Sequence, residues 1–124
     1  ENDLGELLLA TAEGNLSGIS PKFSNKSAVT VVLASEGYPT SSETGREIKG
    51  AKSRIEEGDI VGFVHYAGAE LLDDGSLLST GGRVLAATAI APNLHLALEC
   101  SYALMNEIEL EGSHYRSDIG HRAL

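Results

Sequence analysis

Residues 80–91 read TGGRVLAATAIA: a pair of glycines, one arginine and then a run of apolar and β-branched residues. The run from Arg83 to Ala91 predicts a β-strand, because such side chains favour a pleated, buried surface. Gly81 and Gly82 predict a tight turn before that strand, since glycine adopts positive φ and allows other groups to approach the backbone closely. The planar guanidinium of Arg83 suits either a phosphate or carboxylate ligand or an ion pair at the surface.

Two more apolar runs predict strands, and two leucine-rich segments predict helices. Residues 28–34 (AVTVVLA) form a continuous β-branched run, which is typical of a strand buried on both faces. Residues 60–67 (IVGFVHYA) predict another strand, and the Asp-Gly pair within residues 73–75 predicts a hairpin between two shorter strands. Helical spacing of apolar residues predicts one helix over residues 3–13 and a second one after Asn93.

The order of these elements predicts the fold class. Connections between consecutive strands are short, which favours antiparallel pairing. Strands and helices do not alternate regularly, so a parallel dinucleotide-binding sheet is not expected. The sequence therefore predicts an α+β fold, with a mainly antiparallel sheet of five or six strands flanked by two helices, in a single domain over residues 1–124.

Composition and charge argue against several classes of protein. The chain has 9 Lys+Arg against 18 Asp+Glu and a net charge of -9, whereas nucleic-acid binders and anionic-membrane binders need a basic face. No apolar run approaches the roughly 20 residues of a membrane helix. The single cysteine, Cys100, excludes an intrachain disulfide and predicts a reducing, cytoplasmic location. Residue 1 is Glu and the one methionine is Met105, so we expect a processed, trimmed or partial chain.

Other residues with chemical potential are expected to be structural. His65 lies inside an apolar strand, which predicts a structural histidine with satisfied hydrogen bonds. Cys100 is expected to pack as a small hydrophobe. His114, Asp118 and His121 would share a face only if the tail were helical, and glycines interrupt it, so no metal site is predicted. The sequence has no nucleophile elbow and no phosphate-binding loop, and the residues alone predict no catalytic constellation.

Several short motifs occur in a fixed order along the chain. They are ASEGYP at residues 34–39, AG at 67–68, TGGRVL at 80–85, YA at 102–103 and YRSDIGHRA at 115–123. In this order and spacing they resemble the C-terminal domain of the phosphoribosylamine–glycine ligases, which are ATP-grasp enzymes. The resemblance covers nearly the whole chain.

The resemblance implies an activity that belongs to a longer protein. Family members use ATP to join glycine to 5-phosphoribosylamine, which makes glycinamide ribonucleotide in purine synthesis. ATP and Mg²⁺ (or Mn²⁺) are bound there by central ATP-grasp domains that precede the C-terminal domain. The implied C-terminal domain is barrel-sandwich-like, packs on the N-terminal and ATP-grasp domains, closes one side of the cleft and is inactive alone. Gly81, Gly82 and Arg83 are then expected to bind the ribose-phosphate side of the substrate, with no catalytic residue in this chain. The alternative is a structural role in which Arg83 pairs with another domain of the same protein.

The chain departs from the family pattern near the end of one strand. Many members have a histidine directly before the Ala-Gly of residues 67–68, whereas this chain has Tyr66 there and His65 one residue earlier. Ala69 also replaces a common threonine. Because neighbouring strand residues point to opposite faces, His65 is expected to face away from the side that the family's histidine occupies.

An alternative interpretation is a stand-alone, non-catalytic binding or interaction module with the same sheet. The two interpretations differ in the surface that they predict. A domain of a larger enzyme is expected to expose an apolar patch where its neighbouring domains pack, whereas an autonomous module is not.

Overall fold

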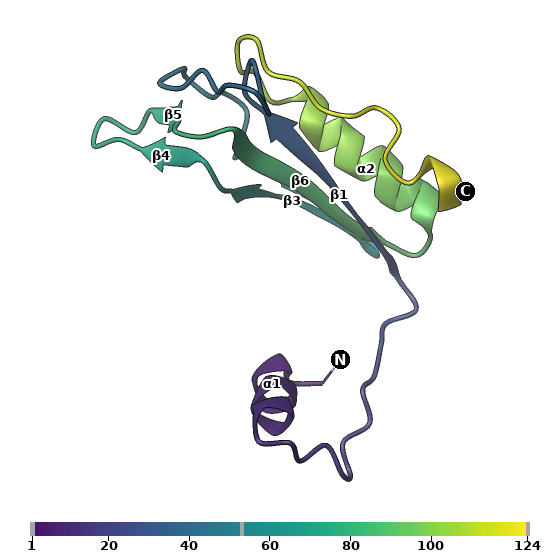
Figure 1. Cartoon of the computed structure of the whole chain (residues 1–124). Helices are drawn as coiled ribbons and strands as arrows, with labels where there is room; N and C mark the ends of the chain where they lie inside the picture. Colours follow the sequence, from purple (N-terminus) through teal and green to yellow (C-terminus); the bar gives the residue numbers. More distant parts are fainter. Residues whose placement is uncertain (1, 53, 124) are drawn as a thin grey trace.

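The computed structural model describes residues 2–52 and 54–123 (Figure 1). The predicted strands and helices are confirmed, with small shifts at their ends. In chain order the elements are α1 (Leu4–Ala12), β1 (Ser27–Ala34), β2 (Ile55–Glu57), β3 (Ile60–Tyr66), β4 (Ala69–Leu71), β5 (Leu77–Ser79), β6 (Arg83–Ala91), α2 (Leu94–Asn106) and a 3-10 turn (His121–Ala123).

The strands form one four-stranded sheet and one two-stranded sheet. The larger sheet has the order β1-β6-β3-β2, and the smaller one pairs β4 with β5. Every pairing is antiparallel, and β6 is central because Ala87 lies opposite both Val31 of β1 and Val64 of β3. The α+β class is therefore confirmed, while the sheets stay open and form no closed barrel.

Helix α2 covers one face of the larger sheet and completes the core (Figure 1). Asn93 caps it as predicted, since its side-chain oxygen accepts a hydrogen bond of 3.0 Å from the backbone N–H of Leu96. From the helix, Leu104 and Met105 are almost fully buried against apolar residues of β1 and β6. The free energy of this core comes chiefly from removing such side chains from water, at about 1.5–3 kcal/mol for each large one.

A glycine in β3 lets the helix lie close to the sheet. A Cβ atom added at Gly62 would lie 2.7 Å from Sγ of Cys100 and 2.8 Å from Cδ1 of Leu104. Cys100 is buried here, and burial raises the pKa of its thiol. The cysteine therefore packs as a small hydrophobe, as its position in the second helix predicts.

The prediction that residues 28–34 are buried on both faces is wrong. Burial alternates along β1: Val29 and Val31 are buried, whereas Thr30 and Val32 are exposed. The reason is that β1 lies at the edge of the sheet and α2 covers one face, while a β-branched run fits both one-sided and two-sided burial. The other face of the sheet is consequently open.

The C-terminal tail is irregular but fastened to α2, beside which it runs in Figure 1. The hydroxyl of Tyr102 donates to the carbonyl of Arg116 at 2.7 Å and accepts from the N–H of Ile119 at 3.1 Å. Backbone hydrogen bonds of 2.9 Å in both directions join Ala34 to His114. These contacts place the tail beside the end of β1, where the ASEGYP motif begins.

Helix α1 lies apart from the sheet, at the end of a long connection (Figure 1). Asp3 is its N-cap, because the side chain of Asp3 accepts a 3.1 Å hydrogen bond from the N–H of Glu6. Thus α2 packs on the sheet while α1 does not. Within residues 2–52 and 54–123, no helix is long and apolar enough to cross a membrane.

Candidate functional site

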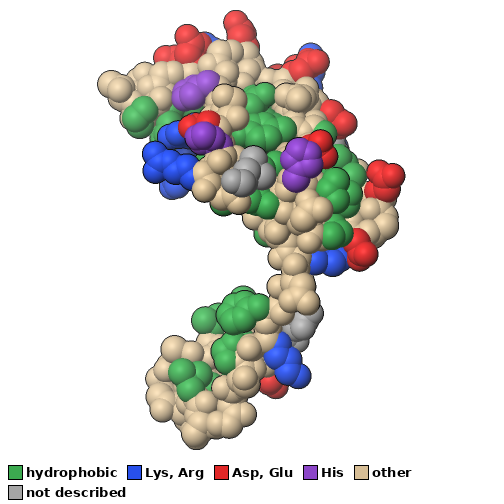
Figure 2. All heavy atoms as spheres, turned by 90° about the vertical axis from the view of Figure 1, so that its right-hand side faces the viewer, with side chains coloured by type: hydrophobic (Ala, Val, Ile, Leu, Met, Phe, Trp, Pro, Cys, Tyr) green, Lys and Arg blue, Asp and Glu red, His purple; other side chains and the backbone are tan. Residues whose placement is uncertain are grey.

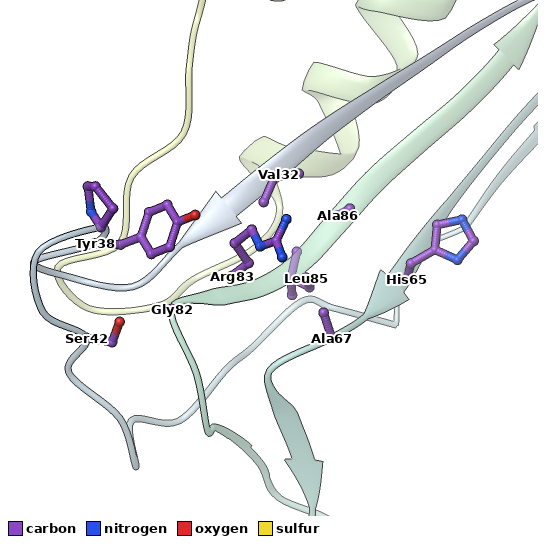
Figure 3. A pocket seen from close by; sticks show the side chains of 10 residues that line it. Val32, Tyr38, Ser42, His65, Ala67, Gly82, Arg83, Leu85 and Ala86 are labelled. Carbon is purple, nitrogen blue, oxygen red and sulfur yellow. The ribbon is translucent and has the colours of Figure 1, made fainter.

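The ASEGYP and TGGRVL motifs, about forty residues apart in sequence, meet around one hollow at the end of β1 and the start of β6 (Figure 3). Its volume is about 560 Å³. The hollow opens on the uncovered face of the sheet. It is lined by Val32, Tyr38, Pro39, Ser42, His65, Ala67, Gly82, Arg83, Leu85 and Ala86.

The turn before β6 is held by a buried serine from the other motif. The N–H of Ser35 donates to the carbonyl of Gly82 at 2.9 Å, and its hydroxyl donates to the carbonyl of Gly81 at 3.2 Å. Ser35 itself is buried, at 2% exposed, and the bond of its hydroxyl is partly buried. The two bonds fix the path of the backbone that leads into Arg83.

Close approach requires a glycine at position 82 but not at position 81, and positive φ is needed at neither, so only part of the predicted reason for the pair is confirmed. Neither Gly81 nor Gly82 has a positive φ. A Cβ at Gly82 would instead lie 2.5 Å from the ring of Tyr38 and 2.7 Å from the hydroxyl oxygen of Ser42. A Cβ at Gly68 would lie 2.9 Å from the backbone nitrogen of Gly81. Gly82 and Gly68 therefore allow neighbouring segments to pack closely against the turn.

Arg83 extends into the hollow between Tyr38 and Val32 (Figure 3). It is exposed, and within the described part of the chain its guanidinium makes no hydrogen bond or ion pair. Other arginines differ, since Arg46 and Arg116 are paired with carboxylates. Arg83 therefore forms no surface ion pair with the described residues, which was the alternative prediction. Its guanidinium is available to an external anion.

His65 lines the same hollow from β3, on the far side from Tyr38 (Figure 3). It is exposed and meets the ring of Phe63 edge-on, with ring centroids 4.8 Å apart. His65 is thus outside the core, because its face of the strand is the uncovered one. The expected alternation is confirmed, since Tyr66 points the other way and its hydroxyl donates to the carbonyl of Ala51 at 3.0 Å.

An ion pair holds the loop that carries Tyr38 and Ser42. Nη1 of Arg46 lies 2.5 Å from Oε2 of Glu36 and donates to the carbonyl of Glu111 at 2.8 Å. The hydrogen bond to Glu36 raises the pKa of Arg46. Gly112 has φ +70° and leaves the space that this pair occupies. We call Glu36, Arg46 and the carbonyl of Glu111 the loop clamp.

The tail residues do not converge on a metal site. Asp118 instead accepts two hydrogen bonds from Arg116, at 2.8 and 2.6 Å. The bonding to Arg116 lowers the pKa of Asp118, which keeps it ionised as the partner of the arginine. Among residues 2–52 and 54–123, no group of three or more His, Cys, Asp and Glu side chains could hold a metal ion.

Tyr38, Ser42 and His65 are the lining residues that sequence reasoning missed as part of a site. The signal for the first two was the glycine-containing ASEGYP motif at the end of β1, where Gly37 has φ +86°. A loop that turns sharply directly after a strand is typical of loops that carry functional residues. For His65, the strand pattern gave its face but not whether that face is covered.

Comparison with known proteins identifies the domain. The sequence model for the family "Phosphoribosylglycinamide synthetase, C domain" matches residues 28–122. The chain belongs to this family. The chain is also 43% identical over 124 residues to the bifunctional purine biosynthetic protein purD of Dictyostelium discoideum, and this match covers 100% of the chain and 15% of that protein. It is 43% identical over 127 residues to the chloroplastic phosphoribosylamine–glycine ligase of Arabidopsis thaliana, covering 100% of the chain and 23% of that enzyme.

A solved structure agrees with the fold of the C domain. The phosphoribosylamine–glycine ligase of Thermotoga maritima is similar with a TM-score of 0.71 and 33% identity, over 94% of this chain and 28% of that one. The chain therefore spans less than a third of the length of these relatives. The resemblance carried by the ordered motifs is confirmed.

The close approach at Gly82 makes a prediction about stability. In the C domain, Gly82→Ala is expected to lower the free energy of unfolding by about 1–3 kcal/mol, because the new Cβ overlaps Tyr38 and Ser42. Gly81→Ala is the matched control, since its Cβ would meet nothing nearer than Cα of Gly68 at 3.5 Å. Thermal unfolding of the two variants measures the difference. Equal losses would show that the loop does not pack on Gly82.

Proposed function

We propose that this chain is the C-terminal domain of an ATP-dependent ligase that joins glycine to 5-phosphoribosylamine, forming glycinamide ribonucleotide in purine synthesis. The match of the family model to residues 28–122 carries this proposal. It is supported by relatives named phosphoribosylamine–glycine ligase that align with the whole chain. The protein is proposed to be cytoplasmic, as the single buried cysteine favours.

In this ligase, the hollow around Arg83 is proposed to hold the phosphate of the ribose-phosphate substrate. The guanidinium offers a planar set of donors that matches phosphate oxygens. Gly81 and Gly82 form the turn that leads into Arg83, and the ring of Tyr38 and the hydroxyl of Ser42 lie against Gly82. These residues bind and orient the substrate, and none of them is proposed to be catalytic.

ATP and Mg²⁺ (or Mn²⁺) are assigned to other segments of the complete protein. Phosphoryl transfer needs metal ions and positioned cations. In the proposed reaction ATP phosphorylates the glycine carboxylate, the amine of the sugar attacks the acyl phosphate, and ADP and phosphate leave. The C domain closes one side of the cleft in which this happens. Its partners are then the N-terminal and ATP-grasp domains of the same protein, with no nucleic acid or membrane involved.

The test is an assay of the complete protein beside the 124-residue chain. The complete protein is expected to release ADP only when glycine, phosphoribosylamine and ATP are all present, and to form glycinamide ribonucleotide. The 124-residue chain alone is expected to release none. A complete protein that forms no glycinamide ribonucleotide would refute the proposal and favour the stand-alone binding module.

A further inference from the structure

The leucines of α1 form an apolar face that nothing in the described chain covers. Leu4, Leu8 and Leu9 are 67%, 61% and 60% exposed. At about 100° per residue, they lie with Gly5 and Ala12 within an arc of about 140°. Figure 2 shows hydrophobic side chains at the surface of this small unit, below the body of the molecule. We call these five positions the leucine face.

The local contacts of α1 shape the helix but leave the leucine face in water. Nδ2 of Asn2 donates to the carbonyl of Ser20 at 3.3 Å, and its Oδ1 accepts from the N–H of Lys22 at 2.6 Å. These bonds fold residues 15–22 back along the side of α1 that carries the buried Ala10. The leucine face lies on the opposite side.

A helix of this length needs packing to be stable. It has 9 residues, and isolated helices shorter than about 12–15 residues are marginal in water. Burying a leucine contributes about 1.5–3 kcal/mol, so burial of these three exposed leucines against a partner would stabilise α1 considerably. Both facts indicate a partner surface for the leucine face.

The comparisons indicate where that partner lies. The family model of the C domain begins at residue 28, so α1 and its connection fall outside it. Relatives nevertheless align over 100% of this chain, α1 included, while the aligned part is 15% to 29% of their length. The α1 segment is thus shared by whole ligases without being part of their C domain.

We propose that the leucine face docks into an apolar groove on the part of the same polypeptide that precedes this chain. This rests on the proposed function, because it takes the chain to be one segment of a longer ligase. In this arrangement α1 belongs to the preceding domain, residues 13–26 form the connection, and the C domain begins at β1. The predicted single domain over residues 1–124 is then revised, because a domain boundary lies inside the chain.

A second copy of the chain is a poorer partner. At 1.5 Å per residue α1 is about 14 Å long, so its leucine face offers far less area than the roughly 800 Å² that each partner of a stable complex buries. A covalently linked partner needs far less surface, because the linkage supplies a high effective concentration.

Cysteine labelling tests the docking directly. Leu8→Cys is introduced both into the complete protein and into the 124-residue chain, and labelling by a maleimide is read by mass spectrometry of the peptide. Position 8 is expected to react at least about 10-fold more slowly in the complete protein, because it becomes accessible only on local opening. Glu6→Cys is the matched control on another side of α1, expected to react at similar rates in both proteins.

Three results would overturn the proposal. Position 8 reacting equally fast in both proteins would show that the leucine face is not covered. Protection in the 124-residue chain that grows with its concentration would assign the face to a second copy. Amide hydrogen exchange on the unmodified proteins gives the third: α1 amides that exchange equally fast in both would exclude docking, whatever the cysteine variants do.

This experiment separates docking from function. Labelling and exchange are measured without substrates, so they do not depend on ligase activity. Protection of α1 in a protein that forms no glycinamide ribonucleotide would leave the docking standing and refute the function. An active ligase in which α1 is unprotected would support the proposed function and refute the docking.

Discussion

Replacing Arg83 with alanine in the complete ligase is expected to raise the KM for phosphoribosylamine about 10- to 100-fold. The guanidinium stands in the hollow without a partner among the described residues, so an anionic substrate would supply its hydrogen bonds. A hydrogen bond to a charged group contributes about 1.5–3 kcal/mol, and about 1.4 kcal/mol corresponds to a factor of ten. The KM for ATP is expected to stay within about two-fold, because ATP is assigned to other domains. Steady-state kinetics with each substrate varied in turn measures both values.

Two controls sharpen this experiment. Arg83→Lys keeps the charge but loses the planar fork, so part of the affinity for phosphoribosylamine is expected to return. Lys52→Ala removes an exposed cation away from the hollow and is expected to leave all KM values unchanged. Equal changes in the KM for ATP and for phosphoribosylamine, or no change in either, would exclude a phosphate-binding role for Arg83.

The largest loss of stability is expected for Leu104→Ala. Leu104 is 0% exposed between α2 and the sheet, and truncating a buried leucine lowers the free energy of unfolding by about 2–5 kcal/mol. The close contact of α2 with the sheet at Gly62 restricts how far the structure can relax into the cavity, which favours the upper part of this range. Urea unfolding of the 124-residue chain, followed by circular dichroism, measures the change.

The matched control for this substitution is Leu71→Ala. Leu71 is a leucine of β4 that is 63% exposed, so its truncation is expected to change stability by less than about 0.5 kcal/mol. Similar losses in the two variants would contradict the packing of α2 on the sheet.

Much of the fold could be predicted because its signals are local. The strand over Arg83–Ala91 and the caps at Asp3 and Asn93 depend on residues within a few positions of each other. What covers each face of the sheet is a long-range property. The run of residues 28–34 could not show that one face of the sheet lacks a helix, and this is why the burial of β1 was predicted wrongly.

The candidate site shows the same division. Arg83 could be predicted as a candidate site residue because its charge and the glycines before it are visible in the sequence. The position of Tyr38 and Ser42 against Gly82 could not, since it is set by contacts between segments more than forty residues apart. The need for glycine at position 82 likewise follows only from the structure, in which Tyr38 and Ser42 pack against it.

The loop clamp has a consequence for how sequences of this family change over generations. Arg46 joins Glu36, which is near it in sequence, to the carbonyl of Glu111, which is 65 residues away. A side chain at position 112 would fill the space of this pair, so a lineage that loses Gly112 must also remodel Glu36 or Arg46. Positions 36, 46 and 112 are therefore expected to covary as one inherited unit, although none of the three lines the hollow whose rim they maintain.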